Sequence, residues 1–557
     1  METIMLVLPF LAAMALFTAA YFIYGRFLEK QYDINDSKVT PSHTDYDGID
    51  RVPAHKAVLL GHHFSSIAGA GPVIGPIIAA LAFGWMPTLL WVLIGSIFIG
   101  GAHDFSALVA SIRHKARSIA EIAKIYMSPL AYKLFLVFIW LSLVYVLAVF
   151  TDLTASSFVE DGGVATSSIL FIVLAVLFGT FVYRLKVSVL KSSLIFVPLV
   201  FVAIWAGQML PISSDISFGG IDLKKMWSIG LIIYCFVAST LPVWILLQPR
   251  DYLSSYLLYS SVLSGFFGIL FGSFAINYPA FTNWSSPQMG SLFPILFITV
   301  ACGACSGFHS LVASGTSSKQ LNKESDAKPI GYGAMLIEGV VAVVAMATVA
   351  MLAKGDSLVT KAPLAIYSAG MSRFLSVFGI PAKLGAAFGL LALSTFILTT
   401  LDTATRLARY IFEEFFDLKD VRWRYVSTLA TLILPTIFAM VTLRDTTGNP
   451  IPAWRAIWPV FGATNQLLAG LVLLVVTVWL KNIGKKVYFA VIPMLFMNVM
   501  TIWAIILLLI QYKFSAIGII AAVLLLLALI LISEAYRVVM KTVNITRLEA
   551  AQVERKL

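Results

Sequence analysis

Residues 61–76 read Gly61-His-His-Phe-Ser-Ser-Ile-Ala-Gly-Ala-Gly-Pro-Val-Ile-Gly-Pro76. Three glycines and two prolines fall within the last eight of these positions. A regular helix is not sustained there, because glycine is entropically costly in a helix and proline removes a backbone donor and clashes with the preceding turn. Both flanks are apolar, so the stretch predicts a buried helix that is broken near its middle.

The composition of the chain places this broken helix in a membrane. Of 557 residues, 59% are hydrophobic and only 12% are charged, whereas a soluble domain carries about 25% charged residues. Apolar runs of about 20 residues recur along the chain, and that length crosses the hydrocarbon core as a helix. The short alternating segments of a β-barrel do not occur in the sequence.

About fifteen transmembrane helices are predicted, with the N-terminus outside and the C-terminus in the cytoplasm of a bacterium, in its inner membrane. The spans are 4–25, 57–82, 86–112, 131–152, 166–183, 192–210, 227–247, 255–277, 292–314, 333–353, 384–404, 426–443, 456–481, 487–511 and 514–535. In this arrangement most of the 39 Lys and Arg lie in cytoplasmic segments, as the positive-inside rule requires. No Lys or Arg is expected deep inside a span. The net charge of +11 is therefore assigned to contact with the lipid bilayer and not to nucleic acid.

Two further spans contain helix-breaking residues. The seventh has Pro242 near its middle, and the ninth contains Gly303 and Gly307 and is followed directly by Gly315. The second and seventh spans are five apart, so they cross the membrane in opposite directions. Paired broken helices in inverted positions indicate an inverted-repeat transporter with a binding site at the membrane midplane.

This pairing predicts a division of the chain into four parts. The two repeats would be residues 57–210 and 227–404. A peripheral helix and loop would occupy 1–56, and peripheral helices with a cytoplasmic tail would occupy 426–557.

The breaks also predict where a substrate binds. Pro72 and Pro242 suit the first position of a new half-helix, and the free N–H groups and positive dipole end there attract a carboxylate. With no cation in the core, a carboxylate would rely on these groups and on nearby hydroxyls. The predicted substrate-binding residues are Ser65, Ser66, Gly69, Ala70, Gly71, Ser239, Thr240, Trp244 and Gln248. The alternative is a packing kink lined by small residues.

Ionisable residues within spans are costly in lipid and are functional candidates by default. Seven are expected, all in the cytoplasmic halves of their spans: His62, His63, His103, Asp104, His309, Glu338 and Asp402. Histidine titrates near neutral pH and a neighbouring carboxylate tunes it, so these residues predict a proton relay or gate. Alternatively, Glu338 and Asp402 reach water or pair with a loop arginine, and His309 is only an interhelical hydrogen-bonding group.

Other site types are weaker interpretations. Gly69, Ser306 and Ser310 could form an oxygen cage for sodium. Cys302 and Cys305 form a C-x-x-C pair, which would need more ligands to hold a metal. We expect no cofactor. A channel and a membrane enzyme are the alternatives to a transporter, but paired broken helices favour the transporter.

The chain resembles the carbon starvation protein A (CstA) family from about residue 55 to 480. The matching stretches are Gly61–Pro72, Gly100–Phe105, Leu241–Tyr252, Ser306–His309, Ser314–Thr316, Lys319–Gln320, Ile330–Gly333, Glu338–Gly339 and Phe461–Gln466. The resemblance implies a symporter of the amino acid–polyamine–cation superfamily. It also implies an all-α polytopic membrane protein with a five-plus-five inverted-repeat (LeuT-like) core and peripheral helices. The substrates implied are pyruvate, with proton coupling, and peptides; sodium coupling stays open.

Overall fold

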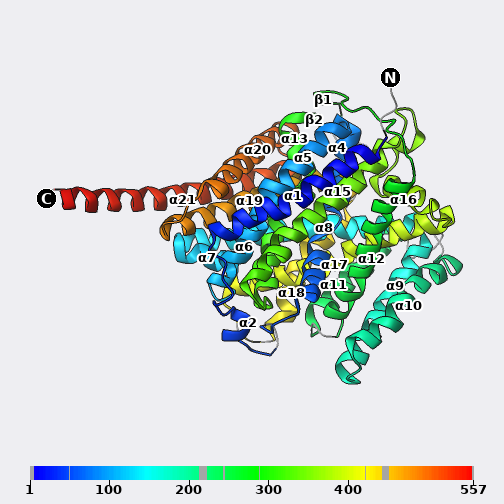
Figure 1. The fold of residues 1–557 in the computed structure, drawn as a ribbon, viewed down its shortest axis with the longest axis horizontal. Helices are drawn as coiled ribbons and strands as arrows, with labels where there is room; N and C mark the ends of the chain where they lie inside the picture. The colour runs from blue at the N-terminus through cyan, green and yellow to red at the C-terminus, as the bar shows by residue number, and fades with distance from the viewer. Residues whose placement is uncertain are drawn as a thin grey trace.

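The computed structural model describes residues 5–48, 51–212, 222–242, 245–287, 289–418, 420, 422–441 and 451–554, and it is a bundle of helices (Figure 1). Within these ranges, thirteen helical segments are long and apolar enough to cross a membrane, and a bent pair of shorter helices makes a fourteenth. The all-α polytopic fold is confirmed. The ninth predicted span, 292–314, is instead two short helices joined by irregular backbone, which accounts for the difference from the predicted fifteen.

Long helical segments make up most of the bundle. They are α1 (Val7–Gln31), α5 (Trp85–Ile94) continued by the π-helical η1 (Gly95–Gly100) and α6 (Gly101–Arg113), α8 (Pro129–Glu160), α9 (Gly162–Gly179) continued by η2 (Thr180–Arg184), α10 (Val189–Met209), α11 (Leu223–Thr240), α12 (Leu247–Phe271), α15 (Ala334–Ala350) preceded by the π-helical η5 (Lys328–Gly333), α17 (Ala382–Phe416), α18 (Trp423–Met440), α19 (Ala453–Asn482), α20 (Tyr488–Tyr512) and α21 (Ala516–Glu554). The shorter elements are α2 (Pro41–Thr44), α7 (Ile119–Tyr126), α16 (Pro363–Ser376), the 3₁₀ turns η3 (Ser317–Lys319), η4 (Glu324–Asp326) and η6 (Ser357–Thr360), and a small hairpin of β1 (Ser285–Ser286) and β2 (Gly290–Ser291).

Two broken helices pack against each other at the centre of the bundle. The first consists of α3 (Lys56–Ile67) and α4 (Gly71–Phe83), which meet at 47°. The second consists of α13 (Leu292–Thr299) and α14 (Gly307–Gly315). Their contact is close, because a Cβ atom on Gly71 would lie 2.4 Å from the Sγ of Cys302. The break predicted from residues 61–76 is therefore present, and a second break covers it.

The predicted interruption of the seventh span is wrong. Helix α11 ends at Thr240 and α12 begins at Leu247, so Pro242 lies in the connection between two separate long helices. Proline commonly follows a helix end because it cannot continue the hydrogen-bonding pattern. Here two arginines of α17 also satisfy the last carbonyls of α11: Arg406 donates to Ala238 and Leu241, and Arg409 donates to Ser239. The partner of the first break is thus 300–306.

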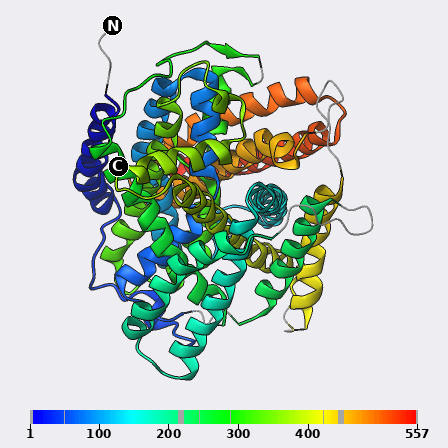
Figure 2. The same ribbon diagram turned by 90° about the vertical axis from the view of Figure 1, so that its right-hand side faces the viewer.

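The remaining helices surround this pair. The α5–α6 segment and α15 pack directly on the broken helices, and α8 packs along α17. Helix α11 packs on α18, α12 on α3, and α19 on α14. Helices α9 and α10 form a hairpin at one edge, and α1 lies on an outer face (Figures 1 and 2). The two breaks are therefore enclosed by long helices, whereas α1, α9 and α10 lie at the periphery.

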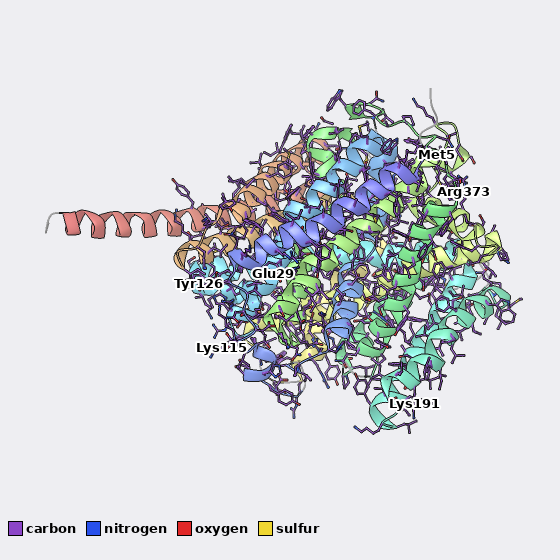
Figure 3. All side chains as sticks on the ribbon, viewed as in Figure 1. Met5, Glu29, Lys115, Tyr126, Lys191 and Arg373 are labelled. Atoms are coloured by element: carbon purple, nitrogen blue, oxygen red, sulfur yellow. The ribbon has the colours of Figure 1, made fainter. Side chains whose placement is uncertain are left out.

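The two ends of the bundle differ in which loops they carry. Met5 and Arg373 lie at one end, whereas Glu29, Lys115 and Lys191 lie toward the other (Figure 3). Glu29, Lys115 and Lys191 belong to segments 26–56, 113–130 and 184–191. The predicted spans place these three segments on the same side of the membrane, which agrees with their positions in the bundle.

Candidate functional site

His309 of α14 lies between two buried carboxylates from different helices. Its Nδ1 atom is 2.8 Å from Oδ2 of Asp104 on α6, and its Nε2 atom is 3.1 Å from Oε2 of Glu338 on α15. The other Asp104 oxygen is 2.7 Å from Nδ1 of His103. None of the four side chains is exposed to solvent. Four of the seven predicted ionisable residues therefore form one cluster.

Local backbone geometry positions the two carboxylates. The π-helical segment η1 ends immediately before α6, which carries Asp104, and η5 ends immediately before α15, which carries Glu338. A π-helical turn inserts a residue into a helix and rotates the side chains that follow, and such turns are frequent at functional sites. Both carboxylates thus reach α14 from helices with the same local irregularity.

The cluster has hydrogen-bonding capacity that the described residues do not use. Within them, Oε1 of Glu338 and Nε2 of His103 have no hydrogen-bond partner. The contact between His309 and Glu338 has an ion-pair distance but not the alignment of a hydrogen bond. Unpaired buried polar atoms are costly, and two of them in one charged cluster make it a candidate functional site.

His63 lies beside this cluster without joining it. Its Nδ1 atom is 2.7 Å from the hydroxyl of Ser317, and its Nε2 atom has no partner in the described part of the chain. The side chain is fully buried in α3, the first half of the broken helix. It is therefore placed to connect the first break with the charged cluster.

A side chain from α19 holds the second break open. The amide of Asn465 donates to Ser306 (3.0 Å) and accepts from the backbone N–H of Phe308 (3.0 Å). The neighbouring Gln466 donates to the carbonyl of Phe297 in α13 (2.9 Å). These contacts replace the helical hydrogen bonds that α13 and α14 lose at their ends, which otherwise stay unsatisfied. The sequence resemblance includes this stretch but did not reveal its role.

The first half of the predicted substrate site is at the first break. Ser65, Ser66, Ala70 and Gly71 are buried at the α3–α4 junction. A Cβ atom on Gly69 would lie 2.8 Å from the Thr400 hydroxyl of α17 and 2.9 Å from the Phe150 ring of α8. The hydroxyls of Ser65 and Ser66 bond to the carbonyls of Asp251 (3.4 Å) and His62 (2.8 Å). The break is thus enclosed by α8, α12 and α17.

The second half of the predicted site is elsewhere. The carbonyl of Ser239 accepts a hydrogen bond from Arg409, which lies nine positions beyond Thr400, or about 13 Å along the same helix. Thr240 bonds to carbonyls of its own helix, and Gln248 accepts from the hydroxyl of Tyr183. Trp244 lies outside the described residues. The structure therefore does not bring Ser239, Thr240 and Gln248 to the first break.

A second buried charged cluster contains two of the predicted residues, Asp402 and His62, together with Arg250 and Asp251, which the predicted spans left in a loop. Arg250 of α12 is fully buried and donates both to Asp402 of α17 and to the hydroxyl of Tyr234, which also donates to Asp402 (2.8 Å). The next residue, Asp251, lies 3.3 Å from His62 of α3. The expectation that the core holds no cation is therefore wrong, because Arg250 is buried in the protein interior. Its cause is the misplaced α12, since a helix starting at Leu247 puts Arg250 in its first turn.

The predicted sodium ligands are already engaged with the protein. The Ser306 hydroxyl is hydrogen-bonded to Asn465, and the Ser310 hydroxyl donates to the Gly307 carbonyl (2.6 Å). Cys302 and Cys305 are free, buried thiols. Within the described ranges, no group of three or more His, Cys, Asp or Glu side chains is arranged to hold a metal ion.

A cavity leads toward the second break from the end of the bundle that carries Lys115 (Figure 3). This cavity, the vestibule, has a volume of about 240 Å³, lies between α7, α8, α14 and α17, and has Arg51, Lys319 and Glu121 in its wall. A second cavity of about 10 Å³, enough for roughly one water molecule, lies beside Asn465. Leu143 and Leu311 line both cavities, so the two cavities are neighbours.

Comparison with known proteins gives one family. The chain matches the family described as carbon starvation protein CstA over residues 3–367 and 355–504. It is 32% identical to a peptide transporter CstA of Bacillus subtilis, with 86% of each chain covered. It is 30% identical to the peptide transporter CstA of Escherichia coli and 29% identical to the pyruvate/proton symporter BtsT of the same species, in each case over 88% of this chain and 80% of the relative.

Proposed function

Because the chain belongs to the carbon starvation protein CstA family, we propose that it is a secondary active transporter that carries a small carboxylate, such as pyruvate, together with a proton. The buried cluster of Asp104, His309 and Glu338 is the observation that carries this proposal. It joins one half of a broken helix to the two helices that flank it. Movement of α14 is therefore coupled to the protonation of the cluster.

Charge counting explains why the cluster takes up a proton. With both carboxylates ionised and His309 protonated, the three side chains carry a net charge of −1. An uncompensated charge at full burial is strongly unfavourable. One additional proton, shared among Asp104, Glu338 and His103, makes the group neutral. Binding of a single proton thus lowers the free energy of the arrangement in which the cluster is fully buried.

The second cluster has the same imbalance. Arg250 faces the two carboxylates of Asp402 and Asp251, and a proton on His62 supplies the missing positive charge. His62 is the member with some solvent exposure, 16% of its side chain. We assign His62 as a residue that exchanges protons with solvent. We assign the Arg250–Asp402 pair as a contact that holds α12 and α17 together beside the first break.

The substrate carboxylate would bind at the first break. The N-terminal turn of α4 offers backbone N–H groups and a positive dipole end at Ala70 and Gly71. Phe150 and Thr400 enclose this position, and no side-chain cation is needed there. In this proposal the substrate passes between Leu143 and Leu311, which line both the vestibule and the small cavity beside Asn465. Positive-inside topology makes the vestibule cytoplasmic.

The pairing of breaks also favours a revised division of the core. In this division the first repeat consists of α3–α6, α8, α11 and α12, and the second consists of α13–α15 and α17–α19. A broken helix opens each repeat, and a helix with a π-helical segment and a buried carboxylate follows it. The α9–α10 hairpin is then an insertion, and α1, α20 and α21 are peripheral. The predicted limits 57–210 and 227–404 would be replaced.

Peptide transport is the second candidate, since relatives that are 30–32% identical bear that name. A peptide also needs a partner for its amino terminus. Both carboxylates of the first cluster are engaged by His309, so they would have to be released first.

Uptake into liposomes tests the proposal and separates the candidates. Labelled pyruvate is offered to reconstituted protein with and without an inward proton gradient, at matched sodium. Faster accumulation with the gradient is the expected result. Accumulation of a labelled dipeptide but not of pyruvate would favour peptide transport. An uptake rate that depends on the sodium concentration at fixed pH would mean that transport is coupled to sodium and not to protons.

A further inference from the structure

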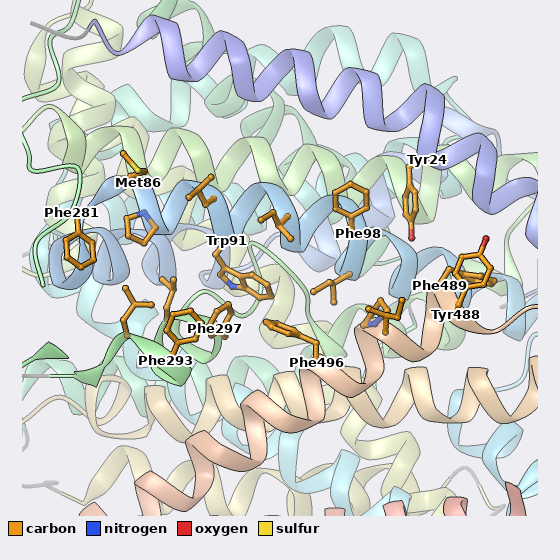
Figure 4. A pocket seen from close by; sticks show the side chains of 18 of the residues that line it. Tyr24, Met86, Trp91, Phe98, Phe281, Phe293, Phe297, Tyr488, Phe489 and Phe496 are labelled. Carbon is orange, nitrogen blue, oxygen red and sulfur yellow. The ribbon is translucent and has the colours of Figure 1, made fainter. Parts of the chain in front are cut away.

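A long apolar groove lies on the outside of the bundle, away from both charged clusters. It has a volume of about 1060 Å³ and lies between α1 and α5 on one side and α13 and α20 on the other (Figure 4). Its wall follows α5 and η1 from Met86 to Ile99, which corresponds to about 20 Å. It therefore runs over most of the hydrocarbon thickness, which is about 30 Å.

The interior of the groove offers almost no polar group. The indole of Trp91 donates to the carbonyl of Val300 (3.2 Å) and so is not available to a ligand. Leu90, Ile94 and Phe98 are each about half exposed in its wall. An occupant of the groove must accordingly be apolar along its length.

The two hydroxyl groups of the groove lie at one end, whereas Trp284 lies beside Phe281 at the other. The hydroxyls belong to Tyr24 and Tyr488, where α1 and α20 converge, and the helices separate toward Met86 and Phe281 (Figure 4). The aromatic residues at both ends, with hydroxyls at one, match the belt that membrane proteins place at the lipid–water interface.

The same end carries an excess of free positive charge. Arg26 and Lys30 follow the groove-lining part of α1, and Lys486 precedes Tyr488; all three are exposed, and within the described residues none has a carboxylate partner. Two neighbouring lysines are already engaged. Lys328 pairs with Glu29 (2.8 Å), and Lys485 pairs with Asp33 and holds the pKa of that carboxyl below its ordinary value. The basic end is thus Arg26, Lys30 and Lys486.

We propose that this groove binds a membrane phospholipid with an anionic headgroup. The acyl chains lie along α5 and α13, and the headgroup meets the basic end and the two tyrosine hydroxyls. Basic residues at the bilayer surface attract anionic lipids in this way. The bound lipid would bridge the outer helices α1 and α20 to α13, which is one half of the second broken helix.

Native mass spectrometry of the full-length protein tests the proposal. The protein is titrated with phosphatidylglycerol and with phosphatidylcholine carrying the same acyl chains. We expect preferential retention of phosphatidylglycerol. The double variant Lys30→Gln/Lys486→Gln should lose this preference, with an affinity about 30-fold lower, since each basic residue contributes to attraction at the surface. Leu90→Trp, which fills the groove, should reduce retention of both lipids.

The matched control is Lys354→Gln/Lys361→Gln, which removes two exposed lysines from the loop before α16. It should retain phosphatidylglycerol as the wild type does. Equal retention of the two lipids by the wild type, or an equal effect of the control, would overturn the proposal. The proposal would also be overturned if the wild type formed dimers and Leu90→Trp abolished them. The occupant of the groove would then be a second copy of the chain.

Discussion

The Nδ1 atom of His309 lies 2.8 Å from Oδ2 of Asp104, and neither side chain is exposed. Their positions are separated by 205 residues in the sequence. The contact joins the second half of a broken helix to a neighbouring continuous helix, so it must break or re-form whenever α14 moves relative to α6.

Asp104→Asn should abolish uptake driven by a proton gradient. The amide keeps the shape of the side chain but removes the charge that pairs with His309, so the cluster no longer needs the additional proton. The measurement is concentrative pyruvate uptake in liposomes. Asp356→Asn is the control, because it changes a loop carboxylate that caps η6, a position where asparagine serves equally well. Undiminished accumulation by folded Asp104→Asn protein would remove Asp104 from the coupling mechanism.

Gly71→Ala should weaken substrate binding, and Gly71→Val should abolish it. A Cβ atom at this position would lie 2.4 Å from both the Cβ and the Sγ of Cys302, so the two breaks are forced apart. Removing that side chain leaves the Cys302 Cα as the nearest atom, at 3.7 Å. The double variant Gly71→Ala/Cys302→Gly should therefore recover binding.

The readout for Gly71 is substrate affinity from equilibrium binding. Gly355→Ala is a suitable control, because nothing lies within 4 Å of its added Cβ. Wild-type affinity in Gly71→Val would contradict binding at the first break. If the double variant Gly71→Ala/Cys302→Gly did not recover substrate binding, the loss of binding in Gly71→Ala would not result from its clash with Cys302.

Asn465→Leu should destabilise the protein and stop transport. The change leaves the N–H of Phe308 without its acceptor and Ser306 without its donor, at a cost of about 2 kcal/mol or more for buried groups. Thermal unfolding in detergent and uptake in liposomes measure the two effects. Asn482→Leu at the exposed end of the same helix should change neither. An unfolding midpoint like that of the wild type would mean that the second break does not depend on Asn465.

Arg250→Met and Asp402→Leu should each destabilise the protein more than the double variant does. Removing one partner of a buried pair leaves an uncompensated charge and costs about 3–5 kcal/mol, whereas replacing both by apolar residues is close to neutral. A double-mutant cycle on thermal unfolding measures this coupling. The half-exposed pair of Arg373 and Asp356, 3.9 Å apart, should give almost none. Additive effects at Arg250 and Asp402 would argue against a contact that holds α12 and α17 together through their pair.

Part of the candidate site was predictable because it is local in the chain. Glycines and prolines at 69–76 break a helix wherever it is placed, and His309, Asp104 and Glu338 stand out because ionisable residues are rare in apolar spans. The prediction at Pro242 was wrong because it, too, used only local sequence. A proline inside an apolar run and a proline after a helix end look alike in sequence, and only the arginines of α17 show that α11 ends there.

Composition and local backbone chemistry were enough to establish that this is a helical membrane protein, that its second span breaks near residues 69–72, and that Asp104, His309 and Glu338 are ionisable residues within spans. Packing in three dimensions set which break pairs with the first, that Arg250 is buried against Asp402, and that Asn465 holds the second break. Each of these rests on contact between segments more than 150 residues apart. Such contacts depend on how the helices pack, and helix packing is set by the whole bundle rather than by any one span.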